Sequence, residues 1–473
     1  MGNCLAGLCR RYCCYCGCRE DEETAEELHR RGAEAWTQYN AEENKDSENR
    51  PGYLATVVTF YTRALDLAGS GHHLLRKTIL VDLIFALLEN DNLDVAHIEE
   101  YFTEVRTIRP LNSHTQQCHF IALKLGEYYE DRWKTSSNEE DFERCVVNYT
   151  HAAHSGSSAE DKVEWFLVVA DLHINRKESS HYERALKSFR EARGAVPKTT
   201  DWDTQRYQIA RGMCTTHMAL SSGGKDKTHL ESAIAECGSA LDLRAPQEDR
   251  RQLLVDYVRC VWALLDNFEG TPSAAVLKKA VTHGREALDW LSSTGDNDGT
   301  KHTVIVLLAN ILSYPSEILR KKDLDEALLL YERAEVVAPM DGDLLRKMAD
   351  AVWLQSKRTN DFEGLQKAID LFVRAYDEAA QNLRANIANN IATIYLERAK
   401  VTNVFDLKLA REYYLRAEQE SSEQDDQIYF AVKVKEIEDA VRELEGVGAS
   451  QVGARRRLSG ERRQTVTRKA TID

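Results

Sequence analysis

The chain has 473 residues, 43% of them hydrophobic, and a formal net charge of −15 at pH 7. This length suits several domains or one elongated domain with a large core, and the acidic charge argues against nucleic acid as a ligand. No run of eighteen or more apolar residues occurs, which excludes a membrane-spanning helix from the sequence.

The charge is distributed unevenly along the chain. Residues 1–19 sum to +3 and residues 454–473 to +5, so residues 20–453 carry −23. Two basic ends therefore flank an acidic body. This arrangement suits an anionic membrane surface on one side and basic protein partners on the other.

The first nineteen residues are predicted to form a lipidated anchor. Gly2 becomes an acceptor for N-myristoylation once Met1 is removed, although Ala6 stands where the usual pattern has Ser or Thr. One myristoyl chain binds a membrane only marginally, whereas two or more chains hold a protein there stably. Six cysteines of this segment are candidates for S-acylation: Cys4, Cys9, Cys13, Cys14, Cys16 and Cys18. The segment resembles the N-termini of dually acylated proteins, which implies the cytoplasmic face of a plasma membrane or endomembrane.

The same cysteines allow a second interpretation. Cys13, Cys14, Cys16 and Cys18 are packed as densely as the cysteines of metallothioneins, and thiolates are good zinc ligands. A structural zinc site normally has a second pair of ligands a dozen or more residues away, and none follows here. A disulfide framework is disfavoured, because no apolar segment of a secretory signal precedes the cysteines.

An internal repeat follows the anchor. Residues 181–197 read HYERALKSFREARGAVP, and residues 323–339 read DLDEALLLYERAEVVAP. Each has a small residue, an aromatic residue four positions later, alanine three positions after that, and proline five further on. The i, i+4, i+7 spacing puts the first three residues, which we call a trio, on one helical face. Alanine on that face lets a neighbouring helix approach closely.

Nine such trios, some with substitutions, occur along the chain, with an amphipathic partner stretch between consecutive ones. They are Val57/Tyr61/Ala64, Ile98/Phe102/Val105, Cys145/Tyr149/Ala152, Ala185/Phe189/Ala192, Ala233/Cys237/Ala240, Ala280/Gly284/Ala287, Ala327/Tyr331/Ala334, Ala368/Phe372/Ala375 and Ala410/Tyr414/Ala417. The last residues of consecutive trios are 40 to 48 positions apart.

These residues, together with the Leu-Gly-x-x-Tyr pattern of residues 125–129 in a first helix, resemble the tetratricopeptide repeat (TPR) family over residues 24–420. The resemblance implies an all-α, right-handed superhelical solenoid of about nine helix pairs, whose first helices line a groove for proteins or peptides. The repeats exceed the family's usual length of about 34 residues, so the helices or the loops must be longer. An irregular α-helical protein, or HEAT or armadillo repeats, are the alternatives; the latter lack the Ala/aromatic/Ala pattern.

The resemblance also points to two partner-binding residues. Asn390 matches the family's first-helix asparagine, whose amide pairs with the backbone of a bound peptide, and Lys347 occupies the corresponding place one repeat earlier. They would contribute to a clamp for a peptide carboxylate, although such a clamp needs several Lys, Arg and Asn side chains. Asn390 can equally stabilise the repeat itself.

The boundaries that follow are an anchor over 1–19, a solenoid over 20–424, a capping helix over 425–446 and a basic tail over 447–473. The capping helix would close the open end of the solenoid with Ile428, Phe430, Val432, Val434 and Ile437. From residue 447 the chain loses apolar periodicity, and we expect disorder.

The tail holds three sites that resemble the substrates of cyclic-AMP-dependent and related basophilic kinases. Two basic residues stand three and two positions before each of Ser459, Thr465 and Thr471. Each phosphate adds about −1.5 to −2 charges, so three would cancel the tail's net charge. We expect an electrostatic switch, in which the unmodified tail lies on the membrane or the acidic solenoid and phosphorylation frees it. A solubilising tail or a nuclear-import-like basic run is the alternative.

No catalytic pattern occurs in the sequence. Residues 223–225, Gly-Gly-Lys, lack the first glycine and the final Ser or Thr of a phosphate-binding loop, and His151 and His154 have no third ligand at useful spacing. We therefore expect no enzyme, no metal in the repeats and no cofactor. The first interpretation is a lipid-anchored TPR scaffold for protein partners; the alternative is a TPR protein whose cysteine-rich N-terminus binds metal or responds to redox state.

Overall fold

The computed structural model describes residues 23–41, 50–69, 71–90, 94–109, 113–243, 247–268, 272–293, 298–314, 321–399 and 403–457, with side chains up to residue 445. These residues form nineteen α-helices, α2 to α20, and one short 3-10 helix (Thr200–Trp202), and they contain no strand. In order, the helices match the nine predicted pairs followed by a capping helix. The described part of the chain is thus an all-α repeat solenoid.

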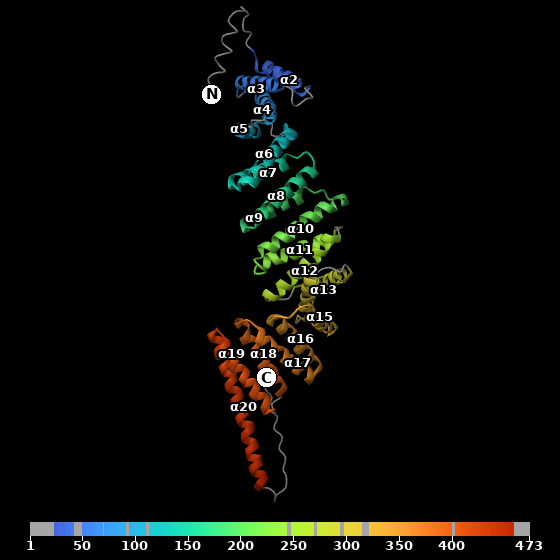
Figure 1. Ribbon diagram of the computed structural model, residues 1–473, viewed down its shortest axis with the longest axis vertical. Helices are drawn as coiled ribbons and strands as arrows, with labels where there is room; N and C mark the ends of the chain where they lie inside the picture. The colour runs from blue at the N-terminus through green and yellow to red at the C-terminus, as the bar shows by residue number, and fades with distance from the viewer. Residues whose placement is uncertain are drawn as a thin grey trace, which may run out of the picture. The chain divides into compact units, whose positions relative to one another are not determined.

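The helices fall into two compact units, α2–α10 and α11–α20. In unit 1 the first helices are α2 (Ala25–Ala41), α4 (His73–Leu88), α6 (Thr115–Ser136), α8 (Ala159–Asn175) and α10 (Asp203–Leu220). The second helices of this unit are α3 (Arg50–Leu67), α5 (Val95–Thr107), α7 (Glu139–Ser155) and α9 (Ser179–Ala195). Each second helix packs against the first helix of its own pair, so the unit is a succession of helical hairpins (Figure 1).

Unit 2 continues the same pattern. Its first helices are α12 (Gln247–Asn267), α14 (Asp298–Ser313), α16 (Gly342–Thr359) and α18 (Gln381–Ala399). Its second helices are α11 (Lys227–Leu241), α13 (Ala274–Ser293), α15 (Lys321–Val337), α17 (Phe362–Glu378) and α19 (Val404–Glu420). The terminal helix is α20 (Gln424–Arg457). Most of these helices exceed fifteen residues, which accounts for much of the repeat's extra length.

The trios form the core of both units. Each of the nine trios lies on a second helix, and every trio residue is buried. In two pairs the aromatic residue packs directly on a glycine of its own first helix: a Cβ at Gly32 would lie 2.4 Å from the ring of Tyr61, and one at Gly126 would lie 2.5 Å from the ring of Tyr149. Small residues therefore allow the helices of a pair to approach closely, as the spacing predicts.

Polar caps fix where several helices begin. Asp341 accepts a hydrogen bond of 2.8 Å from the backbone N–H of Leu344 at the start of α16. At the start of α8, Ser158 and Asp161 form a reciprocal capping box with distances of 3.0 and 3.1 Å. Such caps satisfy N–H groups that have no partner within the helix, and each contributes about 1 kcal/mol.

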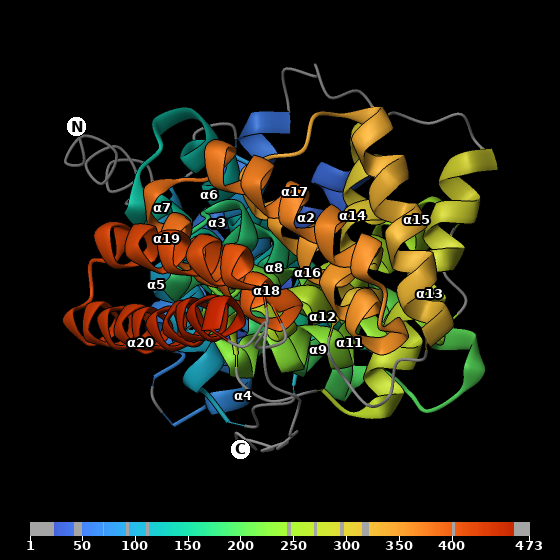
Figure 2. The ribbon, with the colours of Figure 1, turned by 90° about the horizontal axis from the view of Figure 1, so that it is seen from below.

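The terminal helix α20 differs from its prediction in two respects. It packs beside α19 (Figure 2) through Phe430, Val434 and Ile437, but Ile428 and Val432 are 56% and 50% exposed. The first four of these apolar residues alternate with period two, and a helix places only 430, 434 and 437, at i, i+4 and i+7, on one face. The helix also continues past residue 446 to Arg457, a stretch in which no proline interrupts it.

None of the helices in the described ranges is long and apolar enough to cross a membrane.

Candidate functional site

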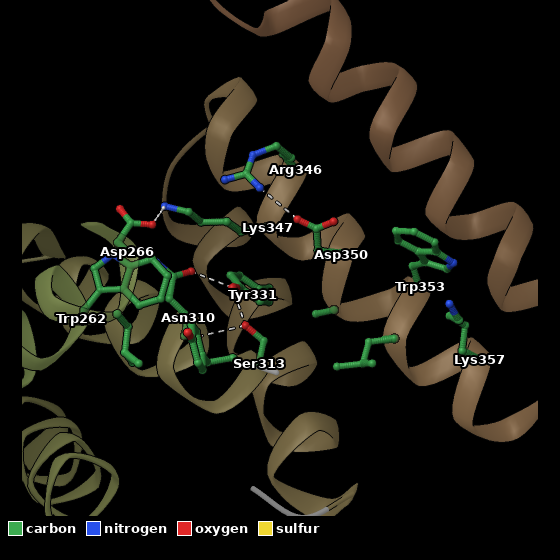
Figure 3. A pocket seen from close by; sticks show the side chains of 14 residues that line it. Trp262, Asp266, Asn310, Ser313, Tyr331, Arg346, Lys347, Asp350, Trp353 and Lys357 are labelled. Carbon is green, nitrogen blue, oxygen red and sulfur yellow. Dashed lines mark hydrogen bonds and ion pairs between the residues drawn. The ribbon is translucent and has the colours of Figure 1, made fainter. Parts of the chain in front are cut away.

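Three successive first helices of unit 2 line a pocket with a volume of about 380 Å³ (Figure 3). Helix α12 contributes Trp262 and Asp266, and α14 contributes Asn310 and Ser313. From α16 come residues at positions 347, 350, 354 and 357, whose i, i+3, i+7, i+10 spacing places them on one helical face. The pocket thus forms where the same face of three successive first helices, α12, α14 and α16, comes together.

The base of the pocket is a buried hydrogen-bond group around Tyr331. This trio residue of α15 is fully buried, and its hydroxyl donates to Asn310 Oδ1 at 2.6 Å and lies 3.2 Å from Ser313 Oγ. Burial raises the pKa of Tyr331 above its ordinary value, so the phenol stays protonated and can donate. The group orients Asn310, which is only 4% exposed.

Cationic side chains at one wall are already paired with carboxylates. Lys347 Nζ lies 2.8 Å from Asp343 and 3.5 Å from Asp266, and it stands 4.8 Å from the centre of the Trp262 ring. Arg346 bridges Asp343 and Asp350 at 2.8 and 3.0 Å. This wall is therefore a closed ion-pair network of low net charge.

The two aspartates bonded to Arg346 differ in acidity. Burial raises the pKa of Asp343, but hydrogen bonds from Lys347 and Arg346 outweigh it, and the net shift is downward. For Asp350, burial dominates over the attraction of Arg346 and raises the pKa to about 6. Protonation of Asp350 below this pH would leave Arg346 with one carboxylate instead of two.

The opposite wall is aromatic. Trp353 Nε1 donates to Glu397 Oε2 of α18 at 2.8 Å, and Lys357 Nζ lies 2.6 Å from Glu397 Oε1. Lys357 also stands 5.0 Å from the centre of the Trp353 ring. With Trp262 and Tyr314, the Trp353 ring gives the pocket an apolar lining between two neutralised charge groups.

The two predicted partner-binding residues lie in the same region. Lys347 lines the pocket, and Asn390 of α18 donates to Asp350 Oδ1 at 3.3 Å. Each is already bonded to an aspartate of the chain, so a peptide carboxylate would have to compete with Asp343 and Asp266 for Lys347. The geometry does not favour a carboxylate clamp, and Asn390 here supports the packing of neighbouring first helices.

The other predicted site residues lie outside the described ranges. These are the candidate lipidation sites Gly2, Cys4, Cys9, Cys13, Cys14, Cys16 and Cys18 and the candidate phosphorylation sites Ser459, Thr465 and Thr471.

The two histidines of α7 have different surroundings. Burial lowers the pKa of His151 to about 4, and His154 packs edge-on against Phe166. Across the described residues, no group of three or more His, Cys, Asp or Glu side chains is placed to hold a metal ion.

Sequence reasoning missed most residues that shape the pocket, including Trp262, Asp266, Tyr314, Asp350 and Trp353. A usable signal was present in α16, where polar and aromatic residues recur at helical spacing around Lys347. The pairing with Asp266 and Trp262 could not be found this way, because it joins residues about 80 positions apart.

No family model and no curated protein matches the chain. Among solved structures, it resembles a TPR protein from Parabacteroides merdae at 11% identity and TM-score 0.33, over 66% of this chain and 99% of that one. Yeast Tom70 matches at 13% identity and TM-score 0.34, over 91% and 99% of the two chains. The TPR domain of P58(IPK) matches at 14% identity and TM-score 0.27, over 89% and 98%. Scores this low do not define a shared superhelix, so the repeat is established by the helix pairs and their buried trios.

Proposed function

We propose that the chain is a lipid-anchored scaffold or adaptor. In this proposal, acyl chains on Gly2 and on Cys4 or its neighbouring cysteines hold the protein at the cytoplasmic face of a plasma membrane or endomembrane. The repeats bind segments of partner proteins along their first helices. Phosphorylation of Ser459, Thr465 and Thr471 by a basophilic kinase regulates the contact of the basic tail with the membrane.

The observation that carries the partner-binding part is the pocket across α12, α14 and α16 (Figure 3). Its aromatic and apolar lining would exclude water from an apolar side chain of a partner, which is the main source of affinity in such contacts. Its charges are paired within the chain and need no counter-ion. The pocket therefore suits an apolar or aromatic side chain in a segment with polar flanks.

A photo-cross-linking experiment tests this function. A benzoylphenylalanine at position 354, whose Leu354 side chain lines the pocket, is activated in cells that express the full chain. The matched control carries the same probe at Val336, which is 88% exposed on α15. We expect cross-linked partner segments with an apolar or aromatic residue at position 354 only, and Trp262→Ala should lower their yield. Equal products at both positions, or no effect of Trp262→Ala, would contradict partner binding in this pocket.

The closely spaced cysteines support a second candidate function, an N-terminus that binds metal or responds to redox state. Intact-mass spectrometry of the N-terminal peptide distinguishes the two. Acyl groups on Gly2 and Cys4 would support the anchor, whereas free Gly2 with thiolate-bound zinc would support the metal-binding alternative.

A further inference from the structure

Unit 1 contains a second pocket, between the first helices α8 and α10, with a volume of about 780 Å³. Val163, Leu167 and Val168 of α8 give it an apolar wall, and Phe189 of α9 forms part of its base. A Cβ at Gly212 of α10 would lie 2.2 Å from this ring. Glycine at this position therefore lets Phe189 and α10 approach closely beneath the cavity.

Three carboxylates of α8 line the same pocket. Glu160, Glu164 and Asp171 are spaced by four and seven residues, so they share one helical face with the apolar wall. The described residues provide none of them with an ion pair or hydrogen bond. Arg211 of α10 also lines the pocket, but it has an interaction of its own and pairs with none of the three.

Other carboxylates of unit 1 do have cationic partners. On the second helices, Arg144 pairs with Glu99 at 3.0 Å, and Arg184 pairs with Glu143 of the neighbouring repeat.

Two further groups of the pocket are poorly compensated by the chain. Gln205 of α10 lines it, and its Oε1 atom is buried without a hydrogen-bond partner. The side chain of Asp171 reaches solvent, yet partial burial beside the apolar wall raises the pKa of its carboxyl group. A cationic side chain in the pocket would favour the ionised form of Asp171.

We propose that this pocket binds an arginine side chain from a basic, partly apolar segment of a partner protein. The inference rests on the proposed protein-binding function and adds a second site with its own chemistry. A guanidinium offers five donors in a fixed plane, enough for two carboxylates, while its methylene stem packs on Leu167 and Val168. A lysine ammonium offers fewer donors and a point charge, so it should bind less tightly.

The test uses the full chain and a labelled synthetic peptide in which arginine alternates with leucine, with fluorescence anisotropy as the readout. The pocket variant Glu160→Gln, Glu164→Gln, Asp171→Asn removes three charges without changing side-chain size. The control variant Glu26→Gln, Glu100→Gln, Glu191→Gln removes three exposed carboxylates of unit 1 that do not line the pocket. We expect the pocket variant to weaken binding by about tenfold or more and the control by less than about twofold.

A second variant checks occupancy without removing charge from α8. Thr215 is exposed at the rim of the pocket, and Thr215→Arg would add an internal guanidinium to it. We expect this variant to keep its helical circular dichroism and to lose peptide binding. A peptide with lysine in place of arginine should bind more weakly to the unaltered chain.

Several results would overturn the proposal. Unchanged binding by the pocket variant would exclude the site, and an equal loss in the control variant would mean non-specific attraction to an acidic surface. The chain's own basic tail could compete with the peptide for the pocket. Neutralising the arginines of residues 454–473 would then raise peptide affinity by about the factor that the pocket variant lowers it, and the occupant would be the tail. Cross-linking at position 354 in unit 2 does not depend on this pocket, so it would still test the proposed function.

Discussion

The glycine at position 126 shows how much a single hydrogen atom matters in a repeat core. A Cβ there would lie 2.5 Å from two carbons of the Tyr149 ring, so Gly126→Ala forces the ring or the α6 backbone to move. We expect a loss of about 1–3 kcal/mol from overpacking, despite the better helix propensity of alanine. Urea unfolding measures it.

Gly52 is the matched control for this prediction. Nothing lies within 4 Å of a Cβ at this position of α3, so Gly52→Ala should be neutral or stabilising by up to about 1 kcal/mol. Equal destabilisation by both substitutions would mean that helix backbone effects, not contact with the aromatic ring, govern the cost.

A buried histidine pair in unit 1 makes stability depend on pH. His173 Nδ1 lies 3.0 Å from His181 Nδ1, the two side chains are 3% and 6% exposed, and Phe142 packs edge-on against both rings. Burial lowers the pKa of His173 to about 4, with smaller effects from His181 and Arg184, and the Glu143 carboxylate opposes the shift. The folded state therefore resists protonation that the unfolded chain accepts below about pH 6.5.

The sign of the effect follows from this difference. The contribution of His173 is fully present above pH 6.5 and is lost as the pH falls from there towards 4, at about 1.4 kcal/mol per pH unit. We expect His173→Gln to flatten the decline in unfolding free energy between pH 6.5 and 4.5 by about 2–3 kcal/mol relative to the unaltered chain. Parallel pH profiles for the two proteins would show that the imidazole is not held neutral.

At the scale of elements, the helices and their order could be predicted because the trio pattern is local. A small residue, an aromatic residue and an alanine within eight positions determine one helical face, and each of the nine faces is buried. The outer face of α20 could not be predicted in the same way. Apolar residues at 428, 430, 432 and 434 follow a strand-like alternation, and only the position of α19 decides which of them are covered.

Substitutions in helix α20 test which of its apolar residues α19 covers. Phe430 is 4% exposed against α19, and Phe430→Ala should cost about 3–5 kcal/mol in the terminal repeat. Val432 is 50% exposed, so Val432→Ala should change the unfolding free energy by less than about 0.5 kcal/mol. Hydrogen exchange of α18 to α20 localises the effect; protection that falls equally in both variants would contradict the assigned faces.

The candidate site could be predicted only in part. Lys347 and Asn390 were recognised from their positions in the repeat, and both lie at or beside the pocket of unit 2. Lys347 pairs with Asp343 of its own helix at the local i, i+4 spacing, whereas its second partner, Asp266, comes from α12. The partner of Asn390, Asp350, comes from α16. No local pattern links these last two pairs, so they required the three-dimensional structure.

For the whole molecule, the charge pattern predicts a switch at the basic tail. Residues 454–473 carry +5, and each basic residue near an anionic leaflet contributes about 1 kcal/mol of attraction. The variant Ser459→Asp, Thr465→Asp, Thr471→Asp should therefore bind phosphatidylserine vesicles more weakly than the unaltered chain. The Ser/Thr→Ala version of the same three positions serves as the control, and equal vesicle binding by the Asp and Ala variants would contradict an electrostatic switch.

In the proposed function, an acylated N-terminus and a repeat surface together concentrate a partner at a membrane. Fractionation of cells after cross-linking at position 354, with the cross-linked partner quantified in the membrane pellet, tests both parts together. We expect Gly2→Ala, Cys4→Ser to move both the chain and its cross-linked partner to the soluble fraction, and Trp262→Ala to leave the chain in the pellet without the partner. A Gly2→Ala, Cys4→Ser variant that stays in the pellet with its partner would rule out the lipid anchor.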